Sequence, residues 1–268
     1  MLSRRSRIYK SINFSEIFSV TLCLCSDILA DSPLPFYDYI INPANESLVG
    51  TKQAYFPVGG PVPPLPKDGK ILSSSKWGGM DAGENMLYSV QVLDGLIHEA
   101  SGLKLLEYLQ GLPPMSPFTD AVGQTIRCRE GKAIISPSFG SLKKYFGGII
   151  HTVPPFFSDP LWERKLEDCY LNSFQLAWDN ESVSYKDFSN SNGISVASVL
   201  LGSGCRGINS NEASRIASVA CSTYNNYLQN RNIRLKHNGR RILHFVLREE
   251  EQCQLLSDHI FTSSGLSN

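Results

Sequence analysis

Two asparagines follow a strand-like apolar segment and could hold a polar ligand. The stretch YIINPANESLVG, residues 39–50, places Asn42 and Asn45 on either side of Pro43 and Ala44. Asparagine is unfavourable inside strands, and its uncharged amide offers two donor hydrogens and an acceptor oxygen. We therefore expect the end of this strand to hold a polar group.

A glycine-rich turn offers a second place for a ligand. In LLGSGCRGINSNEASRI, residues 200–216, Gly202, Gly204 and Gly207 precede a helix-like segment. Glycine lets backbone amides approach a phosphate closely, and the N-terminus of the next helix would add free N–H groups and a favourable dipole. A tight turn without any ligand explains these glycines equally well.

Asp94 and His98 are four residues apart in LDGLIHEASG, residues 93–102, so a helix would place both on one face. This spacing suggests acid/base chemistry, but a single helical histidine is more often a packed residue, and we interpret His98 in that way. We also interpret His151, at the end of a predicted strand, as a packed residue. An aspartate at a helix start is also a good cap. Cys205 lies near a helix start, which can activate a thiol, but without a nearby base we interpret it as a small hydrophobic residue.

Strand-like and helix-like segments alternate along the chain, which is typical of an α/β fold. Asn209 or Ser210 is expected to cap the N-terminus of the helix predicted at residues 210–229. We expect strands at residues 17–25, 38–42, 132–136, 147–153, 194–202 and 241–247, and helices at residues 93–110, 161–178, 210–229 and 249–261.

The composition argues against several classes of protein. Lys+Arg and Asp+Glu both number 25, so the chain lacks the basic excess of a general nucleic-acid binder. The seven cysteines are scattered and odd in number, which indicates a reducing intracellular compartment, cytoplasmic or nuclear. No apolar run approaches the roughly 20 residues that a membrane span needs, and no His, Cys or Asp spacing suggests a metal site. We expect a monomer without a metal or another cofactor.

We expect one domain over residues 17–262, flanked by a basic leader at 1–16 and a short tail at 263–268. The leader resembles a mitochondrial transit peptide, although a ragged basic tail explains it as well. Residues 51–88 are rich in proline, glycine and aromatic side chains, and we interpret them as an insertion. This insertion is either a lid over a ligand or a surface loop packed by its own aromatic residues.

Taken in order, these segments resemble the macro domain, an ADP-ribose-binding module. Five segments between about residues 17 and 250 are similar to motifs of this family and occur in the same order. They are Ser26-Asp27-Ile28, Asn42-Pro43-Ala44-Asn45, LDGLIHEASG at 93–102, HTVPP at 151–155 and GSGCRG at 202–207. The resemblance implies a three-layer α/β/α fold with a mixed, mostly parallel central sheet.

The resemblance also implies roles for individual residues. Asp27 would accept a hydrogen bond from the adenine amino group, beside a backbone contact from Ile28. Asn42 would brace its loop from within, His98 would be structural, and Asn45 would bind a ribose hydroxyl. The phosphate turn would be Gly202, Ser203, Gly204, Cys205, Arg206 and Gly207. In the hydrolytic branch of the family, Asp94 would help to orient or activate water near the distal ribose, and Asn45 would be the other catalytic residue.

Three departures from the family pattern bear on activity. The glycine run before the first helix is replaced by YSVQV, residues 88–92, which puts hydrolysis in doubt more than binding. Arg206 replaces an aromatic residue that usually covers the distal ribose, and could pair with phosphate instead. Leu247, or Phe245, would occupy the place of the adenine-stacking aromatic. We therefore expect binding of ADP-ribose or an ADP-ribosylated protein, with hydrolysis of mono-ADP-ribosyl or O-acetyl-ADP-ribose esters as one outcome. A non-catalytic reader and a protein-interaction scaffold with an occluded cleft are the alternatives.

Overall fold

The computed structural model describes residues 6–29, 33–50, 93–115, 117, 119, 124–179, 193–204, 206–231 and 239–264. Their centre is one seven-stranded sheet in the order β1-β2-β7-β6-β3-β5-β4. Five neighbouring strands, from β2 to β5 in this order, run parallel, and each edge strand is antiparallel to its neighbour. The strands are β1 (Arg7–Asn13), β2 (Phe18–Leu24), β3 (Tyr37–Pro43), β4 (Ala133–Pro137), β5 (Phe146–Thr152), β6 (Gly193–Ser198) and β7 (Arg240–Leu247).

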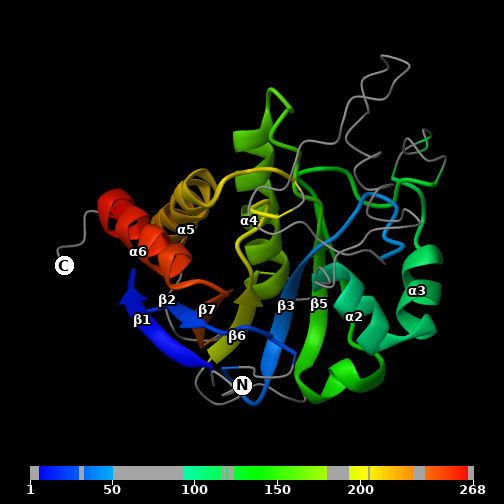
Figure 1. Cartoon of the computed structure of the whole chain (residues 1–268), viewed down its shortest axis with the longest axis horizontal. Helices are drawn as coiled ribbons and strands as arrows, with labels where there is room; N and C mark the ends of the chain where they lie inside the picture. The colour runs from blue at the N-terminus through cyan, green and yellow to red at the C-terminus, as the bar shows by residue number, and fades with distance from the viewer. Residues whose placement is uncertain are drawn as a thin grey trace.

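Helices cover both faces of the sheet, giving three layers (Figure 1). On one face lie α4 (Trp162–Trp178), α5 (Ser210–Asn230) and α6 (Glu250–Ser264), and on the other lie α2 (Leu93–Ser101), α3 (Leu103–Gln110) and the 3-10 turn η1 (Gly140–Lys144). The expected α/β/α fold with a mixed, mostly parallel sheet is confirmed. Of the helices in the described ranges, none is both long enough and apolar enough to cross a membrane.

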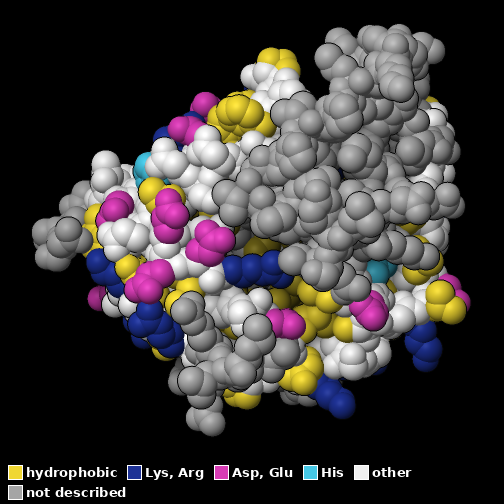
Figure 2. Space-filling model, in the orientation of Figure 1, with side chains coloured by type: hydrophobic (Ala, Val, Ile, Leu, Met, Phe, Trp, Pro, Cys, Tyr) yellow, Lys and Arg dark blue, Asp and Glu magenta, His cyan; other side chains and the backbone are white. Residues whose placement is uncertain are grey.

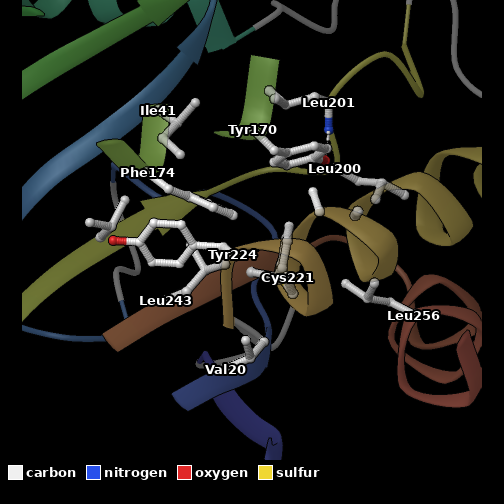
Figure 3. Close-up of a cluster of buried hydrophobic side chains, with 14 of the residues drawn as sticks. Val20, Ile41, Tyr170, Phe174, Leu200, Leu201, Cys221, Tyr224, Leu243 and Leu256 are labelled. Carbon is white, nitrogen blue, oxygen red and sulfur yellow. Dashed lines mark hydrogen bonds between the residues drawn. The ribbon is translucent and has the colours of Figure 1, made fainter. Parts of the chain in front are cut away.

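The larger core lies between the sheet and α4, α5 and α6 (Figure 3). It is rich in aromatic residues, and Tyr170, Phe174 and Tyr224 are fully buried there. The Tyr170 hydroxyl accepts a hydrogen bond from the Leu201 N–H at 2.9 Å. This bond fixes the chain that leaves β6 against α4, and so positions the glycine-rich turn that follows.

Part of the basic leader expected at residues 1–16 is instead a strand of the sheet. Residues 7–13 form β1, which pairs with β2 from Arg7↔Leu24 to Asn13↔Ser19. Its side chains are mostly exposed, as is typical of an edge strand protected by charge, and only Ile12 is buried. The domain therefore includes this strand, and at its other end α6 continues to residue 264.

Two other expected boundaries are wrong. The single helix expected at 93–110 is divided at Gly102, whose φ of 68° is incompatible with a right-handed helix. The strand expected at 194–202 ends at Ser198, and residues 201–204 form a turn. The expected insertion, residues 51–88, lies outside the described residues.

Charged side chains of both signs are interspersed on the described part of the face in Figure 2. This matches a chain with equal numbers of acidic and basic residues.

Candidate functional site

The parallel arrangement brings most of the expected ligand-binding segments to one edge of the sheet. The chain leaves β2 at Asp27, β3 at Asn45, β5 at residues 153–157 and β6 at residues 199–207. Because these strands are parallel neighbours, their carboxyl ends lie at the same edge, which is where open α/β sheets hold ligands.

Asn42 lies below this edge and is completely buried. Its Nδ2 donates to Asp94 Oδ1 at 2.7 Å and lies 3.2 Å from His151 Nδ1. These contacts join β3 to the first turn of α2 and to β5. The Asn42 Oδ1 atom is buried and has no hydrogen-bond partner among the described residues.

Asp94 is the second residue of α2 and is only 1% exposed. The buried residues of this helix are Asp94, Ile97 and Ser101, so one face packs on the sheet. His98 Nε2 lies 3.8 Å from Asp94 Oδ1, too far for a hydrogen bond. The Asp94 carboxylate accepts a hydrogen bond from Asn42 within the fold.

The His98 ring packs against the backbone at Gly50. A Cβ atom added to Gly50 would lie 2.5 Å from His98 Cγ, and Gly50 has a φ of 80°. Both features require glycine there. The loop after β3 can consequently approach α2 only because residue 50 has no side chain.

His151 lies beside Asn42 in the parallel register of β3 and β5, and it is fully buried. Burial, together with the neighbouring His98, lowers the pKa of His151 to about 3. Its ring is therefore neutral at physiological pH. The other ring nitrogen, Nε2, lies 2.9 Å from Ser136 Oγ.

Asn45 is half-buried near the start of the loop that follows β3. Its Oδ1 accepts hydrogen bonds from Ser47 Oγ and from the Val49 N–H, both at 3.2 Å. No acceptor among the described residues bonds to its Nδ2. The side-chain oxygen thus holds the turn.

The glycine-rich turn is folded on itself. Gly202 and Gly207 have positive φ angles, and the N–H of Ile208 donates to Gly202 O at 3.2 Å. The Ser203 hydroxyl donates to Leu200 O at 2.8 Å, so it is used within the turn. Residue Cys205 lies outside the described residues. Asn209 caps α5 by accepting from the Glu212 N–H at 2.9 Å.

Arg206 joins the turn to two other segments at this edge. Its Nη2 donates to Ala44 O at 3.4 Å, and its guanidinium carbon lies 4.2 Å from the centre of the Phe156 ring. The Phe157 N–H donates to Arg206 O at 2.9 Å. The chains that leave β3, β5 and β6 therefore meet at Arg206.

Asp27 and Ile28 lie at the end of β2. Asp27 is half-buried, and its Oδ1 accepts from the Leu29 N–H at 2.8 Å, which forms a turn. Ile28 is buried in the core between the sheet and α2 and α3. The residues expected to cover adenine, Phe245 and Leu247, are buried in the opposite core, so neither can stack on a ligand at this edge.

The site has no metal centre in the described ranges, since no group of three or more His, Cys, Asp or Glu side chains could hold an ion there. Near Asn42 the structure also places Ser136, which the sequence did not single out, and His151, which was expected only to be a packed residue. Their link depends on the pairing of β4, β5 and β3, which the sequence does not reveal.

A model of the macro domain family matches residues 82–217, just over half of the chain. The chain belongs to the macro domain family. Part of it is 33% identical, over 87 residues, to a macro domain-containing protein of Xanthomonas campestris pv. campestris. That match covers 32% of this chain and 43% of the relative, so the chain spans less than half the length of the curated relatives it matches.

Solved macrodomains share the fold along nearly the whole chain. The Oceanobacillus iheyensis macrodomain with ADP superposes with a TM-score of 0.56 at 20% identity, covering 96% of this macro domain and 97% of that chain. A mutant of the same protein with ADPR gives a TM-score of 0.55 at 21% identity, with the same coverage. At this level of identity the comparison establishes the fold.

Proposed function

We propose that this macro domain binds ADP-ribose, free or attached to a protein, at the carboxyl edge of the parallel strands. The observation that carries the proposal is the Arg206 contact with Ala44 O, which brings the glycine-rich turn against the loop that holds Asn45. Family membership and the solved macrodomains with ADP and ADPR support the same ligand.

The roles follow from the chemistry of each group. Asp27 offers a carboxylate to the adenine amino group, and the amino group of Asn45 donates to a ribose hydroxyl. The backbone of the turn from Gly202 to Gly207, with the N-terminal end of α5, faces the diphosphate. Arg206 adds a positive charge and several N–H donors beside this turn.

Calorimetric titration with ADP-ribose, with AMP and NAD as comparison ligands, tests the proposal. We expect selective binding of ADP-ribose, weakened about tenfold in Asn45→Ala through the loss of one or two hydrogen bonds to the ligand. Asn13→Ala is the matched control, because Asn13 is an exposed residue paired with Ser19, near the start of β2 and far from its carboxyl end. Absence of heat at millimolar ADP-ribose would reject the nucleotide site and favour the scaffold alternative.

A second candidate function is hydrolysis of mono-ADP-ribosyl or O-acetyl-ADP-ribose esters, with Asp94 and Asn45 as the catalytic residues. It is motivated by the position of Asp94 at the start of α2, next to the loop that carries Asn45. However, Asp94 is 1% exposed and accepts from Asn42 within the fold. We therefore favour binding without turnover, and propose a reader of ADP-ribosylated proteins.

A turnover assay separates these two functions. Purified protein is incubated with a mono-ADP-ribosylated substrate, and free ADP-ribose is measured for the wild type and for Asp94→Asn. A reader releases no ADP-ribose in either form. Release by the wild type that is lost in Asp94→Asn, with ADP-ribose affinity retained, would establish the hydrolase instead.

A further inference from the structure

Four buried polar side chains form a continuous chain of hydrogen bonds beneath the proposed ligand site. Asp94 Oδ1 contacts Asn42 Nδ2 at 2.7 Å, Asn42 Nδ2 contacts His151 Nδ1 at 3.2 Å, and His151 Nε2 contacts Ser136 Oγ at 2.9 Å. None of the four residues is more than 1% exposed. They come from α2, β3, β5 and β4, so the chain crosses from the first turn of a helix to the edge of the sheet.

The direction of every bond in this chain is determined by its first member. A carboxylate only accepts hydrogen bonds, so the amide nitrogen of Asn42 must face Asp94. Its second hydrogen then points to His151 Nδ1, which must carry a lone pair. The proton of the neutral ring is consequently on Nε2 and is donated to Ser136 Oγ. The Ser136 hydroxyl hydrogen remains for Pro137 O, 3.3 Å away.

This orientation leaves one group unsatisfied. Asn42 Oδ1 is buried without a hydrogen-bond partner among the described residues. A buried carbonyl oxygen without a donor is unfavourable, and rotation of the amide would be the ordinary way to relieve it. The amide keeps its orientation because both hydrogens on Nδ2 have acceptors, one at Asp94 and one at His151.

We propose that His151 is a positioning residue for the nucleotide site, acting through the amide of Asn42. His151 supplies the second acceptor that holds this amide toward Asp94, and the amide in turn joins the end of β3 to the start of α2. Asn45 lies three residues after Asn42 in the loop that this junction supports. The effect on ligand affinity rests on the proposed function, whereas the orientation of the network does not.

The first test determines which ring nitrogen of His151 carries the proton. The measurement is long-range ¹H–¹⁵N NMR of the full chain without ligand. We expect Nε2 to be protonated and Nδ1 to be unprotonated between pH 5 and 8. A ring with its proton on Nδ1, or a charged ring in this range, would overturn the proposal, because Nδ1 could not then accept from Asn42.

The second test compares two substitutions of His151, each of which keeps a polar atom near the position of one of the two ring nitrogens. Asn at position 151 keeps an acceptor close to the place of Nδ1, and Gln keeps an amide close to the place of Nε2. We expect the Asn42 side-chain amide resonances to keep their positions in His151→Asn and to shift in His151→Gln. We also expect ADP-ribose affinity within about threefold of wild type in His151→Asn and about tenfold weaker in His151→Gln.

Thermal unfolding of both variants separates positioning from simple loss of packing. The proposal is overturned if affinity and the Asn42 resonances change equally in the two variants, or only in proportion to their loss of stability. If the wild type binds no ADP-ribose, the proposed function fails, and the ring protonation and Asn42 resonances still decide whether His151 holds the amide.

Discussion

Replacing Asn42 by aspartate tests the buried network most severely. The substitution changes almost no volume, but it places a second carboxylate where Nδ2 now lies, 2.7 Å from Asp94 Oδ1. Two buried carboxylates at this distance cannot both remain charged, so the folded protein must bind a proton between them. The unfolded chain does not need this proton at neutral pH.

The cost of that proton sets the size of the effect. Protonating a carboxyl group with an ordinary pKa near 4 costs about 4 kcal/mol at pH 7, and this cost falls by about 1.4 kcal/mol per pH unit. Loss of the second N–H, which now faces His151 Nδ1, adds about 1 kcal/mol. We therefore expect Asn42→Asp to lower the free energy of unfolding by about 4–5 kcal/mol at pH 7 and by about 1 kcal/mol at pH 4.

The sign follows from proton linkage. The folded variant holds one more proton than its unfolded state above pH 4, so its stability relative to wild type decreases as the pH rises. Urea unfolding of both proteins at pH 7, 6, 5 and 4 measures this difference directly.

Asn45→Asp is the matched control within the same motif. Asn45 is half-buried and its Oδ1 only accepts, from Ser47 Oγ and the Val49 N–H, which a carboxylate does equally well. Its cost should stay below about 1 kcal/mol, as for an ordinary surface substitution. An Asn42→Asp variant that loses no more stability than this control, or loses the same amount at every pH, would refute the reasoning.

Three further outcomes are expected. Gly50→Ala combines a φ of 80° with a Cβ atom 2.5 Å from the His98 ring, so its free energy of unfolding, measured by thermal unfolding, should fall by more than about 2 kcal/mol. In the control Gly102→Ala, with a φ of 68° and open space around the Cβ atom, the fall should be about 1 kcal/mol. Equal losses in the two variants would contradict the close contact at Gly50. Burial lowers the pKa of His244 to about 4, and burial together with the nearby His98 lowers the pKa of His151 to about 3. Both rings are therefore neutral in the folded protein, whereas in the unfolded chain they gain protons below about pH 6.5. Stability should therefore fall as the pH drops from about 6.5 toward 4, and substituting both by Gln should flatten that slope; an unchanged slope would argue against buried neutral rings. The six described cysteines are free and buried, so at most one thiol of the native protein should react rapidly with Ellman's reagent, and rapid reaction of two or more would contradict this burial.

The sequence predicts most of the fold because its buried strands are continuous apolar runs. Strand β1 escaped this reasoning, since Arg7 and Lys10 make an exposed edge strand look like a basic leader. The division between α2 and α3 was missed for another reason. Leucines continue at helical spacing through Gly102, and only the backbone angle there shows that the helix ends.

The sequence predicted which segments lie at the candidate site, but it did not predict the contacts between their side chains. Motif order placed Asp27, Asn45 and the glycine-rich turn at strand ends, and the parallel sheet brings those ends to one edge. The contacts below the site were not predictable, because Asn42 meets His151 only through the β3–β5 register. The contact of Arg206 with Phe156 is likewise a product of tertiary packing.

The most direct test of the nucleotide site is a ¹H–¹⁵N NMR titration of the purified protein with ADP-ribose. Binding at the proposed place predicts saturable shifts in the backbone amides of Asp27, Asn45 and the turn from Gly202 to Gly207, while the β1 amides remain unchanged. Saturable shifts confined to other surfaces, or no shifts at millimolar ADP-ribose, would contradict the assignment of this edge as the ADP-ribose site.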